Sequence, residues 1–218
     1  MKRTGLALAA ISLLGWGAAA NAGIVSAMEY LNDAAFSTAT GAVSLTGPIP
    51  NIGNQGTSAI LGDATLTAGN SIIVGSGWST KFPGAGSHAI AISGPEDVEI
   101  AINTGLATAF GFYFHEPTLD TVQLDGCNTL CVQSTFSIDF YRSGALLDSD
   151  TFDPADDRLI FYGVILDEAF DEVRFRETVG THDNEFFGEM YIAVPEPTTL
   201  LLLGLGLAGL GLVRRRLH

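Results

Sequence analysis

Residues 109–114 read Ala-Phe-Gly-Phe-Tyr-Phe, and this short run decides the fold class. Phe110, Phe112 and Phe114 occupy every second position, so in an extended chain their three rings point to the same side. An aromatic face with a period of two is typical of a strand that covers a hydrophobic core on one side. The run therefore predicts a β-strand that lies half-buried in a sheet.

The same alternation occurs in other parts of the chain. Apolar residues stand at every second position in 136–140 and again in 173–176, where Arg174 and Arg176 lie between them. Further strands are predicted at 71–74, 88–92, 98–103, 159–166 and 185–194. Turn-forming residues separate these runs. Eight or more strands at this spacing favour an all-β fold, a two-sheet β-sandwich of jelly-roll type.

The chain before residue 70 is less regular. Residues 33–41 begin with Asp33, an N-cap candidate, and end with Gly41, which together predict one short helix. Residues 41–69 are rich in Gly, Asn, Thr and Pro, a composition typical of a long surface loop or an irregular sandwich edge. We therefore divide the body into an irregular part, residues 23–69, and a sandwich, residues 70–193.

The first 22 residues are predicted to be a secretory signal peptide with a signal helix. Lys2-Arg3 precede the apolar run 6–20, and Ala20-Asn21-Ala22 places small residues at the two positions that a signal peptidase reads. Signal peptidase is thus the first expected partner. The mature chain is expected to begin at Gly23.

Residues 194–218 have the features of a second targeting segment. Pro195, Glu196 and Pro197 precede the uncharged stretch 198–213, which ends at Arg214, Arg215 and Arg216. Sixteen residues make about 24 Å of helix, against a hydrocarbon core of about 30 Å, so the stretch predicts a short transmembrane helix that spans only just. The arginines would hold its end on the cytoplasmic side, and the body would then lie outside.

This order of elements resembles the PEP-CTERM sorting signal of bacterial exported proteins. The resemblance covers about residues 194–218, with 195–197 as the recognition motif and 214–216 as the cytoplasmic stop. It implies an exosortase, a membrane protease and transpeptidase that cuts near the motif. It also implies a precursor transiently anchored in the inner membrane of a Gram-negative bacterium, which then moves to the cell surface or the extracellular matrix. An ordinary membrane tail is the alternative.

Charge limits the partners of the body. The whole chain carries 10 Lys and Arg against 24 Asp and Glu. Five of the basic residues and one acid lie in the two terminal segments, which leaves a net charge of −18 on the body. Such a surface repels nucleic acid, so no nucleic-acid partner is expected. It suits divalent cations or basic partners, or it keeps an exported protein soluble.

Cys127 and Cys131 are the two cysteines of the chain. Export to an oxidising compartment favours a disulfide between them, which would close a small ring and fix one turn. Free thiols are the alternative. The spacing is not Cys-x-x-Cys, so a catalytic or metal role is not favoured.

The densest acidic cluster lies at 148–157 and is predicted to be a turn. Asp148, Asp150, Asp153 and Asp156 are candidate ligands of a structural calcium ion, the only cofactor considered. The EF-hand pattern is absent, because Asp153 stands where that loop requires glycine. A solvated acidic loop is the alternative.

Catalytic motifs are not found. The segment Gly75-Ser76-Gly77-Trp78-Ser79 lacks the Gly-x-Ser-x-Gly spacing of a nucleophile elbow, and His115 lacks the second histidine of a zinc motif. Pairs of carboxylates occur by chance in so acidic a chain. We expect a non-enzymatic protein, with a secreted hydrolase as the more distant alternative.

Carbohydrate binding is the nearer alternative. Sandwiches bind sugars through exposed aromatic rings and polar groups near loops, and Trp78 and Tyr162 are the candidate ligand residues. Extracellular polysaccharide is then the candidate partner, while ordinary packing is the other interpretation of these rings. The preferred hypothesis is an exported surface or extracellular-matrix protein with a structural or adhesive role.

Overall fold

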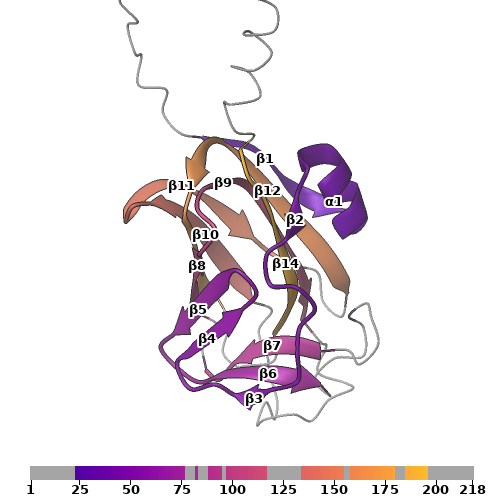
Figure 1. Cartoon of the computed structure of the whole chain (residues 1–218), viewed down its shortest axis with the longest axis vertical. Helices are drawn as coiled ribbons and strands as arrows, with labels where there is room; N and C mark the ends of the chain where they lie inside the picture. The colour runs from indigo at the N-terminus through magenta and orange to yellow at the C-terminus, as the bar shows by residue number, and fades with distance from the viewer. Residues whose placement is uncertain are drawn as a thin grey trace, which may run out of the picture.

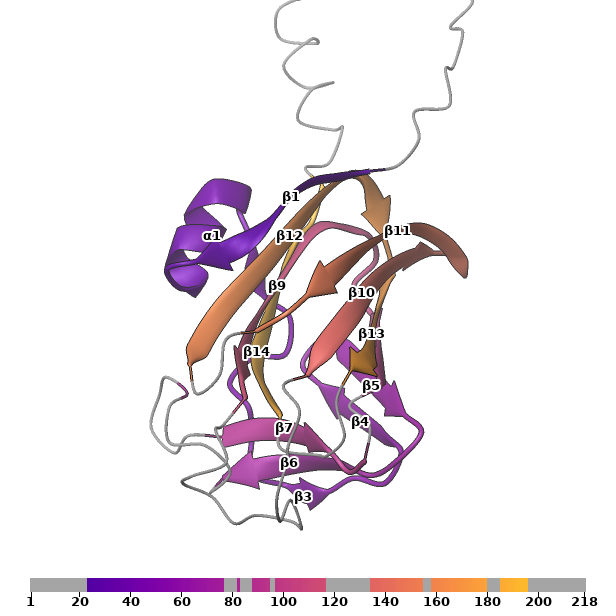
Figure 2. The ribbon, with the colours of Figure 1, turned by 180° about the vertical axis from the view of Figure 1, so that it is seen from behind.

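The computed structural model describes residues 23–76, 82, 88–94, 97–116, 134–154, 158–179 and 185–195. They form two antiparallel sheets that pack face to face, with one helix on the outer side of the larger sheet (Figures 1 and 2). The prediction of an all-β, two-sheet β-sandwich is confirmed. The predicted signal helix and the predicted span 198–213 lie outside the described residues, in which no helix is long and apolar enough to cross a membrane.

The larger sheet, sheet A, has eight strands. In spatial order these are β1 (Ile24–Tyr30), β12 (Leu159–Phe170), β9 (Ala107–His115), β14 (Phe186–Ala193), β7 (His88–Ile92), β6 (Ile72–Ser76) and β3 (Gly53–Asn54), with β2 (Val43–Ser44) also paired to β14. Sheet B has six: β11 (Ala145–Phe152), β10 (Thr135–Arg142), β13 (Glu172–Val179), β8 (Val98–Ile102), β5 (Ala64–Ala68) and β4 (Ser58–Leu61).

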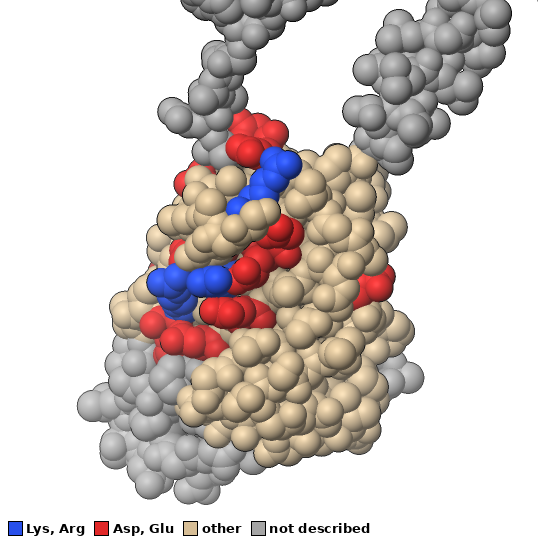
Figure 3. Space-filling view, turned by 60° about the vertical axis from the view of Figure 1, so that its left-hand side comes forward, with Lys and Arg blue, Asp and Glu red and all other residues tan. Residues whose placement is uncertain are grey.

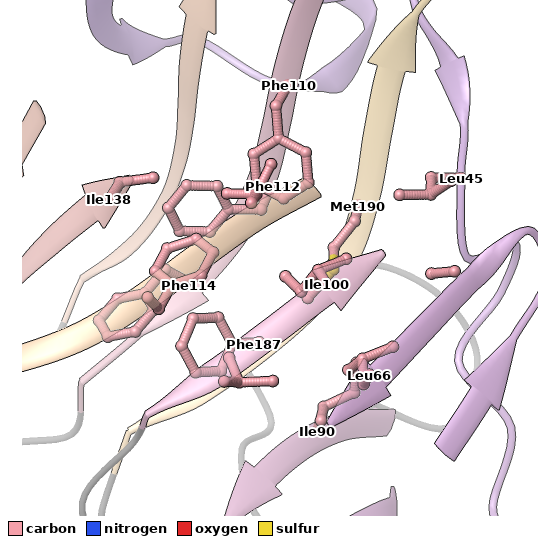
Figure 4. Packing of buried hydrophobic residues seen from close by; sticks show 14 of the residues in the cluster. Leu45, Leu66, Ile90, Ile100, Phe110, Phe112, Phe114, Ile138, Phe187 and Met190 are labelled. Atoms are coloured by element: carbon pink, nitrogen blue, oxygen red, sulfur yellow. The ribbon is translucent and has the colours of Figure 1, made fainter. Parts of the chain in front are cut away.

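The alternating phenylalanines of β9 fill the space between the sheets, as Figure 4 shows. Phe110, Phe112 and Phe114 are fully buried. The ring of Phe112 lies edge-on to Phe175 of sheet B, with 4.9 Å between ring centroids, and edge-on to Phe152 at 5.3 Å. Burying a phenylalanine contributes about 1.5–3 kcal/mol to the free energy of folding. Because these rings come from both sheets, the aromatic cluster holds the two sheets together.

The outer face of sheet A is also covered. Phe36 of the helix α1 (Asp33–Thr40) is fully buried against it. Its ring lies over Gly111 and Gly163, which are partners in the pairing of β9 with β12. A Cβ atom at Gly163 would stand 2.7 Å from ring carbons of Phe36, and one at Gly111 would stand 2.8 Å from the same ring. The two glycines therefore make the hollow that receives the helix.

The ends of α1 correct one detail of the sequence prediction. The N-cap is Asn32, whose Oδ1 accepts a hydrogen bond of 2.9 Å from the N–H of Ala35, and not Asp33. Asp33 instead accepts a hydrogen bond of 2.7 Å from the hydroxyl of Tyr113. Either residue type can cap a helix. The tertiary bond to Tyr113 engages Asp33, so the cap moves to the residue before it.

Residues before 70 are more regular than predicted. They supply β1 and β2 to sheet A and a regular hairpin, β4 with β5, to one edge of sheet B. The surface-loop interpretation is wrong for this hairpin, which lies at an edge of the sandwich as the alternative expected but pairs regularly. Three of its five inward residues are alanines, Ala59, Ala64 and Ala68, so the alternation of hydrophobic residues is weak.

The first and last described residues lie at the same end of sheet A. A row of partners runs across four neighbouring strands through Ser26, Ile165, Ala109 and Ala193. At about 4.8 Å per strand, the start of β1 and the end of β14 are roughly 14 Å apart. Both lie at the top of Figures 1 and 2. We call this end of the sandwich the tail pole and the opposite end the far pole.

Gly163→Ala should push α1 away from sheet A and lower the free energy of unfolding by about 1–3 kcal/mol, because the added methyl group overlaps Phe36. Gly69→Ala is the matched control, since nothing lies within 4 Å of a Cβ atom there. It should change stability by less than about 0.5 kcal/mol. Urea unfolding of the purified mature protein measures both. Equal losses in the two variants would contradict the role of the glycine pair.

Tyr113→Phe should flatten the alkaline loss of stability. Burial, and then the hydrogen bond to Asp33, raises the pKa of Tyr113 from 10.0 to about 12. The stabilisation is therefore complete below pH 10.0 and is lost as the pH rises to about 12. Over this interval the native protein should lose roughly 2 kcal/mol more than the variant. Unfolding free energies measured across the interval test this, and parallel profiles would contradict it.

Candidate functional site

Most residues that the sequence assigned to sorting, bridging or binding lie outside the described residues. These are Glu196, Pro197, Arg214, Arg215, Arg216, Cys127, Cys131, Trp78 and Asp156. Pro195 is described: it lies two residues beyond the end of β14 and is partly exposed. The sorting motif therefore begins where β14, a strand inside sheet A, ends.

Tyr162 packs against the core. Its ring centroid lies 4.8 Å from that of Phe152, and its hydroxyl donates a hydrogen bond of 2.7 Å to Asp150. Burial, and then this hydrogen bond, raises the pKa of Tyr162 well above its ordinary value. The geometry favours the packing interpretation of this ring over ligand contact.

Asp148 and Asp150 lie in the strand β11 and not in the predicted turn. Asp148 accepts a hydrogen bond of 2.8 Å from the N–H of Ile24, and Asp150 accepts the one from Tyr162. Both donors belong to sheet A, so these carboxylates link the two sheets along an edge of sheet B. Asp153 accepts a hydrogen bond of 3.4 Å from the hydroxyl of Thr135. Within the described ranges, no group of three or more acidic, His or Cys residues is placed to hold a metal ion.

A polar groove crosses the outer face of sheet B. We call it the arginine groove, and it has a volume of about 290 Å³. Its floor is formed by strand positions whose side chains point into the core. Its walls are polar side chains of β5, β8 and β13 and of the residue before β8. The wall residues are Thr67, Asp97, Glu99, Arg174 and Arg176.

Strand register places the wall residues beside one another. Glu99 pairs with Thr67 on one side and with Arg174 on the other, and Arg174 pairs in turn with Asp139 of β10. In Figure 3, basic and acidic side chains lie interleaved in a band along the left part of the face. Residues far apart in sequence thus form one continuous polar row.

Ion pairs fix both arginines. The Nε atom of Arg174 lies 3.5 Å from Glu99 and hydrogen-bonds to Glu172, and its guanidinium carbon stands 4.2 Å above the ring of Tyr141. Arg176 lies 3.3 Å from Asp139 and donates to the hydroxyl of Tyr141 at 2.9 Å. The hydrogen bond to Glu172 raises the pKa of Arg174, so this side chain stays charged. Tyr141 is thereby held between two cations.

A second polar cluster is buried at the far pole. His115, Glu116, Ser134 and Glu185 are each at most 3% exposed. The N–H of Ser134 donates to Glu116 at 2.8 Å, and its hydroxyl bonds to Glu185. These contacts join the end of β9 to the residues that precede β10 and β14. No signal in the sequence distinguishes these residues from the other acids, and the cluster was not predicted.

The fold and the site define an acidic β-sandwich whose last strand leads directly into a sorting segment. Residues 193–216 match the family model of the PEP-CTERM protein-sorting motif. The chain therefore carries a PEP-CTERM protein-sorting motif directly after its last strand, and this motif indicates export. No curated protein sequence matches the chain.

Two solved structures share low similarity with the chain, and both are mutants of CBM29-2, a family 29 carbohydrate-binding module. The first has 15% identity and a TM-score of 0.35, and the match covers 77% of this chain and 86% of that one. The second, in complex with mannohexaose, has 15% identity and a TM-score of 0.33, with 67% and 89% covered. Likeness at this level is not a reason to infer a shared ligand.

Proposed function

We propose that the protein is a non-enzymatic surface or extracellular-matrix protein with a structural or adhesive role. An inner-membrane precursor is released or transferred by an exosortase-type protease. The observation that supports this most directly is the position of the sorting motif, which begins at the last residue of β14. The described residues before the motif belong to the sandwich and to the helix that covers it, and the motif follows the last strand directly.

The tail pole faces the membrane in this proposal. Four residues, and so five residue-to-residue steps, separate Ala193 from residue 198, where the predicted span begins. Fully extended, they reach about 17 Å. Because β1 begins at the same pole, both terminal segments leave the sandwich on one side. The far pole then points away from the membrane.

The fold also limits where a sorting protease can cut. β14 lies inside sheet A and pairs with β9 through Ala193. A cut before Ala193 would take residues out of a central strand, whereas Val194 is 53% exposed and pairs with neither neighbour. We therefore propose that cleavage falls at or beyond Val194, so the mature sandwich is released whole.

Replacing Arg214, Arg215 and Arg216 together with glutamine should impair retention of the precursor in the membrane. Without these charges a span that is barely long enough loses its cytoplasmic stop. Fractionation of cells that express the full chain, followed by immunoblotting, measures the retained share, which we expect to fall several-fold. Arg142→Gln is the control, because Arg142 is a surface residue of the sandwich that pairs with Glu168. Unchanged retention and processing would contradict the proposal.

A further inference from the structure

The arginine groove is built by the backbone as well as by side chains. Ala68, Val98 and Phe175 turn their side chains into the core, so the floor between the outward side chains is low. Gly69 continues this floor, and nothing lies within 4 Å of the place where its Cβ atom would stand. A volume of about 290 Å³ is near the lower limit of small-ligand sites. The groove therefore suits a short stretch of a ligand.

The charges of the groove cancel. The groove is lined by Arg174 and Arg176, two of the four arginines of the described residues, and by the acids Asp97 and Glu99. Among the lining residues two arginines thus balance two acids, in a body that carries −18, while Glu172 and Asp139 beside the groove pair with the same two arginines. An anionic ligand would be repelled by the body, and a cationic ligand would meet two arginines. A neutral ligand that both donates and accepts hydrogen bonds avoids both penalties.

The groove offers hydrogen-bonding groups that are already in place. The Nη atoms of Arg174 donate no hydrogen bond to any residue in the described part of the chain, although the Nε atom is fixed by its acidic neighbours. Glu99 is 53% exposed and Arg176 is 52% exposed, so both are accessible to a ligand. Neighbouring hydroxyl groups of a sugar can accept from a guanidinium and donate to a carboxylate. Side chains ordered before binding reduce its entropic cost.

We propose that the arginine groove binds a neutral, hydroxyl-rich polysaccharide, with Arg174 and Glu99 as its central hydrogen-bonding pair. This inference rests on the proposed function, because such polymers are met outside the cell. The position of the groove also makes it accessible to a polymer outside the cell. Glu172 begins β13 at the tail pole, and Arg174 and Arg176 follow it toward the far pole. The open face of the sheet lets a polymer enter and leave along its length.

Affinity electrophoresis of the purified mature protein tests the proposal. The probes are soluble dextran and glucomannan as neutral polymers and alginate as the anionic polymer. We expect retardation in at least one neutral gel and none in alginate. Arg174→Gln should weaken binding at least tenfold, and so should Arg174→Lys, because lysine keeps the charge but loses the planar fork. Arg158→Gln, which removes an exposed arginine paired with Glu29, should bind like the native protein.

Thr67→Trp separates loss of the groove from loss of the fold. Thr67 is exposed on β5, so an indole would fill the groove while every charge remains. We expect this variant to have the same unfolding temperature as the native protein but to lose polysaccharide binding. Native binding by folded Arg174→Gln or Thr67→Trp would overturn the proposal, and so would tighter binding of alginate or no retardation in either neutral gel. A protein that is exported and processed but not retarded would overturn this site alone and leave the proposed function intact.

Discussion

The close contact of Phe36 with Gly111 and Gly163 is the constraint on which the rest of the structure depends. These two glycines are partners in neighbouring strands, and only an absent side chain at both positions admits the ring. The other face of β9, the strand that contains Gly111, carries the phenylalanines that contact sheet B. Sheet A is therefore covered on both sides, and its central strands are fixed in register. That register places the start of β1 and the end of β14 at one pole.

Carboxylates in this acidic protein act as links between elements. Asp148 and Asp150 hold β11 to sheet A through Ile24 and Tyr162. Asp33 joins α1 to Tyr113. Inward-facing charges on an edge strand also disfavour pairing with another chain. Part of the negative charge thus has a structural role.

The sequence revealed the elements whose signals are local. The aromatic period of two identified β9, β10 and β13, and the order of motif, apolar stretch and arginines identified the sorting segment. The strand β11 was missed as a strand because its aspartates have low β propensity, and contacts with sheet A override that propensity. The arginine groove could not be predicted, because it exists only when Thr67, Glu99 and Arg174 come into register across three strands.

The central claim is that a whole sandwich, folded up to the sorting motif, is exported and processed at the pole where both terminal segments leave. Intact-mass spectrometry of the native protein, recovered separately from cells and medium, tests it most directly. The account predicts a product that begins at Gly23 and ends at or beyond Val194, found outside the cytoplasm. A full-length product in the cytosol with both ends uncut, or a product that ends within β14, would contradict it.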